Sequence, residues 1–201
     1  MTTTTYPNGQ QLISSALTIP QVNVLLQNLT CGMLGINPPS PSLVRVDWQS
    51  EGQPDVALPS QDSCYLSCTP ENVDYHLVRD RTFTGSGPVT ENWNYTRGWR
   101  FLWDLYGPNS LDRARQIYSA LFMDYFTNQF ELSNLYPVLD PPEPVRLPIN
   151  HNAQWYEHTH FYCTFYEAIT ETIQDAVVTS VEVLVNTKDE SPAADIVIST
   201  T

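Results

Sequence analysis

Residues 94–106 read NYTRGWRFLWDLY, and large apolar side chains alternate with polar ones along this stretch. A period of two predicts a β-strand, whose apolar face carries Tyr95, Trp99, Phe101, Trp103 and Leu105. The opposite face carries Asn94, Thr96, Arg100 and Asp104, with Leu102 among them. Gly107 and Pro108 follow directly and end the strand. The stretch is therefore predicted to be a half-buried strand of a sheet.

Two helices are predicted, one after this strand and one near the N-terminus. From Asn109, which can cap a helix, apolar residues recur at helical spacing as far as Phe126. At ~1.5 Å per residue this helix is about 28 Å long, enough to cross a sheet. Thr18 and Pro20 predict the start of the earlier helix, and Gly35 offers its end.

Further strands are predicted over residues 43–49, 63–69, 76–83, 154–168 and 175–187. Because helices and strands do not alternate strictly, we predict an α+β fold. It has a largely antiparallel sheet of about five strands flanked by two main helices, with a long Pro-rich loop over residues 131–153 and terminal arms. We expect an N-terminal arm over residues 1–17, a single domain over residues 18–188 and a flexible C-terminal tail over residues 189–201.

The chain is strongly acidic, with 9 Lys and Arg against 22 Asp and Glu and a formal net charge of -13. Proteins that grip nucleic-acid phosphates need the opposite balance, so we expect no specific DNA binding. The negative charge is consistent with an acidic surface along which DNA slides without binding. It is also consistent with a role in solubility alone. Since no apolar run reaches the ~18 residues of a membrane span, and the N-terminus has no basic residue, we expect no membrane contact and no signal peptide.

A pair of histidines, His158 and His160, is the best metal candidate. On a strand they share one face about 6.6 Å apart, and His76 or His151 could add a third ligand. Cys163 has the opposite parity and lies on the other face. The alternative is a polar-aromatic strand face that suits a wet subunit contact. We favour this alternative and predict no metal and no cofactor.

Catalytic arrangements are not indicated. The sequence has no Gly-x-Ser-x-Gly elbow, and His160 and Cys163 point in opposite directions on one strand. Pairs of carboxylates have no specificity as a signal, because the chain contains 22 acidic residues. We predict that the protein is not an enzyme.

The order of these segments resembles the phage neck or tail terminator family. The resemblance rests on the run Arg100-Phe-Leu-Trp-Asp-Leu-Tyr-Gly-Pro108, which leads into a helix, the Pro-rich loop and then Gln154-Trp-Tyr-Glu157. It covers roughly residues 15–188. The family implies a sheet flanked by helices, without a cofactor or a catalytic residue.

The resemblance also implies where such a protein works. Members form a homo-oligomeric ring, usually a hexamer, at the head-proximal end of the tail. The ring ends tail-tube polymerisation, contacts the tail tube protein and the head-tail connector or adaptor protein, and lets DNA pass through its lumen. The expected location is the tail and neck of the virion, after assembly in the host cytoplasm.

Ring closure uses two different surfaces of each subunit, and we expect long loops and arms to supply them. The predicted interface residues are Tyr136, Pro141, Pro142, Pro144, Arg146, Tyr156, His158, His160 and Tyr162. Two alternatives stay open. One is another neck component, a head-tail joining or adaptor protein, and the other is a small-ligand or metal-binding α+β module.

Overall fold

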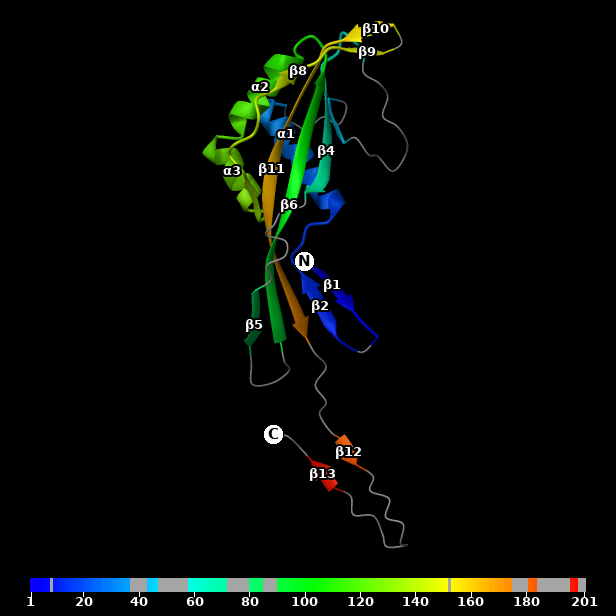
Figure 1. The fold of residues 1–201 in the computed structure, drawn as a ribbon, viewed down its shortest axis with the longest axis vertical. Helices are drawn as coiled ribbons and strands as arrows, with labels where there is room; N and C mark the ends of the chain where they lie inside the picture. Colours follow the sequence, from blue (N-terminus) through cyan, green and yellow to red (C-terminus); the bar gives the residue numbers. More distant parts are fainter. Residues whose placement is uncertain are drawn as a thin grey trace.

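Two strands of 17 residues each form the centre of the molecule. The computed structural model describes residues 1–7, 9–36, 43–46, 58–71, 80–84, 90–151, 153–174, 181–183 and 196–198. Strands β6 (Thr90–Tyr106) and β11 (His158–Gln174) pair antiparallel over their whole length (Figure 1). The strand predicted over residues 94–106 is thus confirmed, and it begins four residues earlier.

Shorter strands line both outer edges of this pair. On the β6 side, β4 (Ser63–Glu71) and β5 (Asp80–Thr84) pair with successive parts of β6, and β3 (Val44–Val46) pairs parallel to β4. On the β11 side, β2 (Gln11–Ser14), β7 (Leu135–Pro137) and β8 (Val145–Arg146) share the edge, and β1 (Thr2–Thr5) pairs with β2. Together they make a nine-stranded sheet that curls into a half-barrel.

Two small sheets lie apart from the main one. Strands β9 (Ile149–His151) and β10 (Gln154–Tyr156) form a hairpin at the end of the molecule where β6 ends and β11 begins (Figure 1). Strands β12 (Val181–Val183) and β13 (Ile196–Ile198) form the second two-stranded sheet.

Three helices pack on one face of the sheet: α1 (Ile19–Met33), α2 (Ser110–Ala120) and α3 (Asp124–Glu131). The core between them is aromatic. The rings of Trp103 and Phe161, opposite each other on β6 and β11, stack with centroids 4.9 Å apart. Phe130 of α3 packs on Phe165 of β11, and the Trp103 indole N–H donates a hydrogen bond to Thr30 of α1. Helices α1 and α3 therefore meet the same row of large side chains.

The predicted fold class was wrong. In the described residues strands dominate, the main sheet has nine strands rather than about five, and there are three helices rather than two. Most of the missed strands have two to four residues, and β2, β7 and β8 among them take their conformation from the edge of β11. Such segments carry too few residues for a period of two to be visible in the sequence.

The helix predicted from residue 109 to residue 126 is two helices. Residues Leu121 to Met123 separate α2 from α3, and Met123 has an extended backbone with φ -83° and ψ 128°. No Gly or Pro marks the break. The turn instead lets both Leu121 and Phe130 reach the core, where each is almost fully buried. Tertiary packing therefore overrides a continuous helical pattern.

The remaining predicted segments are partly described. The strand predicted over 154–168 is present but interrupted at Glu157, between β10 and β11. The Pro-rich connection contains β7, β8 and β9. Residues 47–49, 76–79, 175–180 and 184–187 of the other predicted strands lie outside the described residues, as does most of the predicted tail. Within the part of the chain that is described, the helices are too short or too polar to cross a membrane.

Candidate functional site

The face of the sheet opposite the helices carries the candidate site. Because side chains alternate along a strand, the odd-numbered residues 99–105 of β6 and 159–169 of β11 are buried, and their even-numbered neighbours line this helix-free face. This face is polar and aromatic. Strand β4 contributes Tyr65, Ser67, Thr69 and Glu71 to it. Strands β6 and β11 contribute Arg100, Leu102, Asp104, Tyr106, His158, His160, Tyr162, Thr164 and Tyr166. The predicted polar-aromatic face of the histidine strand is thus present.

Three potential metal ligands meet on this helix-free face. Asp104 lies directly opposite His160 in the β6–β11 register, and His158 lies two residues along from His160. One side-chain ligand atom from each of the three residues lies within 4.8 Å of those from the other two. Asp104 thus supplies the third group. Of the two histidines suggested for that place, His76 lies outside the described residues and His151 belongs to strand β9.

His158 is held from three sides. Its Nε2 atom lies 3.0 Å from Oδ1 of Asp104, and its Nδ1 atom lies 3.2 Å from the carbonyl oxygen of Leu147. The Tyr106 ring stacks on the imidazole with centroids 4.7 Å apart. Only 6% of His158 remains exposed, whereas Asp104 and His160 are half-buried. The ring is therefore fixed in orientation next to two groups that solvent can still reach.

A second polar group lies further along the same face, beginning at Tyr162, which is two residues from His160 on β11. Arg100 forms an ion pair with Glu71, and its guanidinium lies over the Tyr162 ring, 4.8 Å from the centroid. The Thr164 hydroxyl donates a hydrogen bond of 2.9 Å to the other oxygen of Glu71. Arg100 and Tyr162 remain partly exposed, so this group offers charge, an aromatic ring and hydrogen-bonding atoms to a partner surface.

The thiols offer no nucleophile on this face. Cys163 points into the core, and burial raises the pKa of its thiol to about 12, so it stays neutral near pH 7. Burial also raises the pKa of Cys68, whose Sγ lies 3.0 Å from Oδ1 of Asn23. The predicted separation of Cys163 from the two histidines agrees with these positions.

Comparison with known proteins identifies the family. The family model described as phage neck terminator protein matches residues 21–189, most of the chain. The chain belongs to the phage neck terminator protein family. It is therefore a structural protein of the tail and neck of the bacteriophage virion. A search of curated proteins finds no match.

The predicted interface residues of this neck terminator are distributed over several elements. Tyr136 lies in β7, Arg146 in β8 and Tyr156 in β10, whereas His158, His160 and Tyr162 lie in β11. Tyr136 and Tyr162 are about 40% exposed, Pro142 and Arg146 are exposed, and Pro144, Tyr156 and His160 are half-buried. Pro141 and His158 are buried, so these two residues are not available as direct contacts in the subunit.

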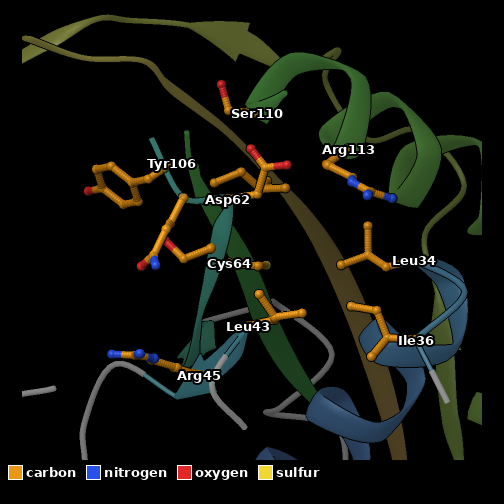
Figure 2. A pocket seen from close by; sticks show the side chains of 12 residues that line it. Leu34, Ile36, Leu43, Arg45, Asp62, Cys64, Tyr106, Ser110 and Arg113 are labelled. Atoms are coloured by element: carbon orange, nitrogen blue, oxygen red, sulfur yellow. The ribbon is translucent and has the colours of Figure 1, made fainter. Parts of the chain in front are cut away.

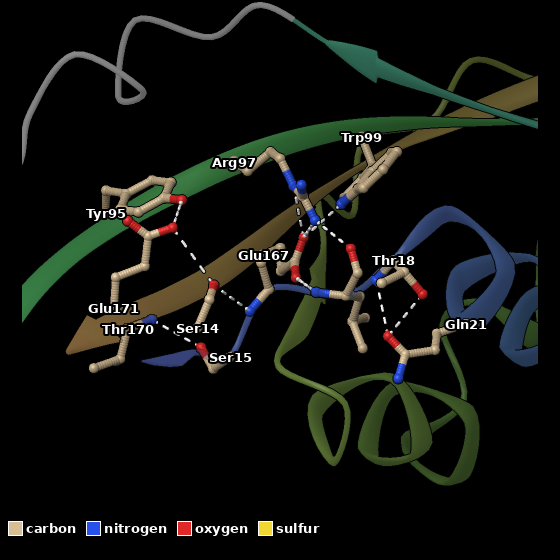
Figure 3. A network of polar contacts seen from close by, with 12 residues as sticks. Ser14, Ser15, Thr18, Gln21, Tyr95, Arg97, Trp99, Glu167, Thr170 and Glu171 are labelled. Atoms are coloured by element: carbon tan, nitrogen blue, oxygen red, sulfur yellow. Dashed lines mark hydrogen bonds and ion pairs between the residues drawn. The ribbon is translucent and has the colours of Figure 1, made fainter. Parts of the chain in front are cut away.

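A buried carboxylate fastens the N-terminal segment of the neck terminator to the sheet (Figure 3). Glu167 of β11 is 1% exposed, and it accepts hydrogen bonds from Arg97, from the Trp99 indole N–H and from the backbone N–H of Leu17. Arg97 also donates to the carbonyl of Leu17. The segment between β2 and α1 is thus bound from both sides. Sequence analysis missed this ion pair, because residues 97 and 167 are brought together only by strand register.

A pocket of about 460 Å³ lies at the N-terminus of α2 (Figure 2). Leu34, Leu43 and Leu105 are among its apolar lining residues, and Asp62 and Arg113 are among its polar ones. The Asp62 carboxylate accepts hydrogen bonds from the backbone and the side chain of Asn109. Asn109 therefore occupies the predicted cap position, but its side chain bonds to Asp62 instead of capping the helix.

Proposed function

We propose that this neck terminator works as a homo-oligomeric ring of six copies at the head-proximal end of the tail. The ring ends tail-tube polymerisation by contact with the tail tube protein, docks onto the head-tail connector or adaptor protein, and leaves a lumen through which DNA passes. It acts by shape and self-association, without catalysis, and it assembles in the host cytoplasm before it becomes part of the virion.

The exposed β9–β10 hairpin is the observation that carries this proposal. Trp155 of β10 is 69% exposed, and Ile149 of β9 and Leu147 just before it are 38% and 50% exposed. A two-stranded hairpin has little stability of its own in water, and a large exposed aromatic side chain is typical of contact surfaces. We therefore assign the hairpin to a contact with the neighbouring subunit.

A second apolar surface lies on a different part of the subunit. The helical corner between α2 and α3 exposes Phe122, Met123 and Tyr125 by 45–66%, and Leu132 just after α3 is 79% exposed. Figure 1 places α3 well away from the hairpin. A closed ring needs two different complementary surfaces on each copy. The hairpin and the helical corner supply such a pair.

The charge supports a passage for DNA. Six copies carry a formal charge of -78 (6 × -13), which repels phosphate. A lumen wall without clustered Lys and Arg does not retain the duplex by counterion release.

The test compares Trp155→Ser with Val24→Ser, a change at an exposed apolar residue of α1. Wild type and Val24→Ser should elute with a mass near 137 kDa (6 × 22.8 kDa) and show rings in electron micrographs. Trp155→Ser should weaken assembly at least about tenfold, because a buried aromatic anchor typically contributes 2 kcal/mol or more. Unchanged circular dichroism would show that the subunit still folds.

Two results would contradict the proposal. A wild-type chain that stays monomeric at high concentration, even together with its tail tube and connector proteins, would exclude the ring. A Trp155→Ser ring of unchanged stability would show that the hairpin is not the contact.

A further inference from the structure

The Asp104–His158–His160 group on the helix-free face has the composition of a metal site. Two imidazoles and one carboxylate are the ligands that Zn²⁺ takes in open sites, which leave one coordination position for water. Contrary to the expectation from sequence, we propose that these three residues bind one divalent transition-metal ion, with zinc as the preferred ion. This proposal does not rest on ring formation.

The distances already suit a small cation. Zn²⁺ binds imidazole nitrogen and carboxylate oxygen at about 2.0–2.2 Å, so neighbouring ligands of a tetrahedral site lie roughly 3.4 Å apart. Nε2 of His158 and Oδ1 of Asp104 are 3.0 Å apart, and all three ligand atoms fall within 4.8 Å of one another. Closing the site would need the His160 side chain to turn towards the other two ligands, and that side chain is only half-buried.

The hydrogen bonds of His158 have an arrangement that is common for a metal-binding histidine. A carbonyl oxygen can only accept, so the contact with Leu147 requires the proton to be on Nδ1 of His158. This tautomer leaves Nε2 of His158 facing Oδ1 of Asp104 at 3.0 Å. A backbone carbonyl that receives the other ring N–H is also the usual support of a metal-binding histidine.

The site has a rigid base and an open side. All three residues lie on the two central strands, and Asp104 and His160 are direct cross-strand neighbours. The Asp104 side chain is 23% exposed, so an ion and a water molecule can enter from the helix-free face. A metal there would join β6 to β11 next to the β9–β10 hairpin and hold that end of the sheet together.

Zinc uptake by the full chain tests the proposal. The protein is stripped with a chelator, dialysed, and titrated with ZnCl₂ by calorimetry, and elemental analysis gives the bound metal per chain. We expect one Zn²⁺ per chain and a rise in Tm on addition of zinc. Asp104→Asn and His160→Ala should each weaken zinc binding at least tenfold and abolish the Tm rise. The matched control Asp112→Asn removes an exposed carboxylate of α2 and should bind like wild type.

His160→Ala separates the metal site from a plain ion pair. An Asp104–His158⁺ ion pair needs no His160, so in that case zinc would leave the Tm of wild type and of His160→Ala equally unchanged. That result would overturn the proposal, as would a wild-type chain without stoichiometric zinc, or variants that bind zinc as well as wild type. Since both changed side chains are partly exposed, circular dichroism should show folded variants.

Discussion

At the scale of single residues, Gly107 shows how closely the end of β6 is packed. Its φ of 108° lies where L side chains rarely fit, and a Cβ atom there would come within 2.6 Å of the Gln61 carbonyl oxygen. Gly35, with φ 69°, has the same kind of backbone but open space around it. Substitutions at the two glycines therefore distinguish the cost of backbone strain, which both positions have, from the cost of steric overlap, which only Gly107 has.

We expect Gly107→Ala to destabilise the protein more than Gly35→Ala. Gly35→Ala should cost about 1–2 kcal/mol of unfolding free energy from the left-handed backbone alone. Gly107→Ala should cost at least about 1 kcal/mol more, because its neighbour is backbone and overpacking typically costs 1–3 kcal/mol. Urea denaturation of both variants gives the difference. Equal losses would show that the Asp62 segment moves away without cost.

Single residues also show what sequence could and could not predict. The polar face of β6 with Asp104, and the shared face of His158 and His160, follow from a period of two and were predicted. The meeting of Asp104 with these histidines depends on the β6–β11 register, which pairs residue 104 with residue 160. Nothing local in either strand sets that offset, because it results from packing of the whole sheet.

At the scale of elements, the N-terminal segment is joined to the long strands by one buried ion pair. Glu167 is inaccessible to solvent, whereas Arg97 is 26% exposed, and both bind Leu17 of the segment that connects β2 to α1. The same segment begins α1, where Gln21 accepts a hydrogen bond from the backbone N–H of Thr18. Loss of the carboxylate would therefore act on the strands and the helix together.

Glu167→Gln is expected to lower the unfolding free energy by roughly 3 kcal/mol, the lower end of the cost of breaking a buried pair, since Arg97 is partly solvated. The control Glu71→Gln breaks the more exposed pair with Arg100 and should cost less than about 1 kcal/mol. Chemical denaturation followed by tryptophan fluorescence measures both. If the two variants lose equal stability, Glu167 does not fasten the segment.

The elements missed by sequence analysis share one cause. Strands such as β7 and β8 have three and two residues, and they are extended because the edge of β11 offers them hydrogen bonds. The break between α2 and α3 has no local breaker and follows from the burial of Leu121 and Phe130. Long amphipathic elements were visible in the sequence, whereas short ones depend on partners far along the chain.

At the scale of the whole molecule, the acidic charge gives a prediction about DNA. A chain of net charge -13 releases few counterions from a duplex and is repelled by it. We expect no retardation of random-sequence duplex DNA in a gel-shift assay at about 50 mM salt, run beside a basic protein of similar size as positive control. A shift that disappears on raising the salt would contradict a lumen that DNA passes without binding.

The continuous pairing of β6 with β11 has a mechanical consequence for a protein in the phage neck. Seventeen residues of strand span about 56 Å at ~3.3 Å per residue, and the helices cover only one part of that length (Figure 1). A pull along the strands loads all the backbone hydrogen bonds of the ladder in shear at once. Slippage by one residue would turn every buried ring outward, so the pair resists tension as a unit.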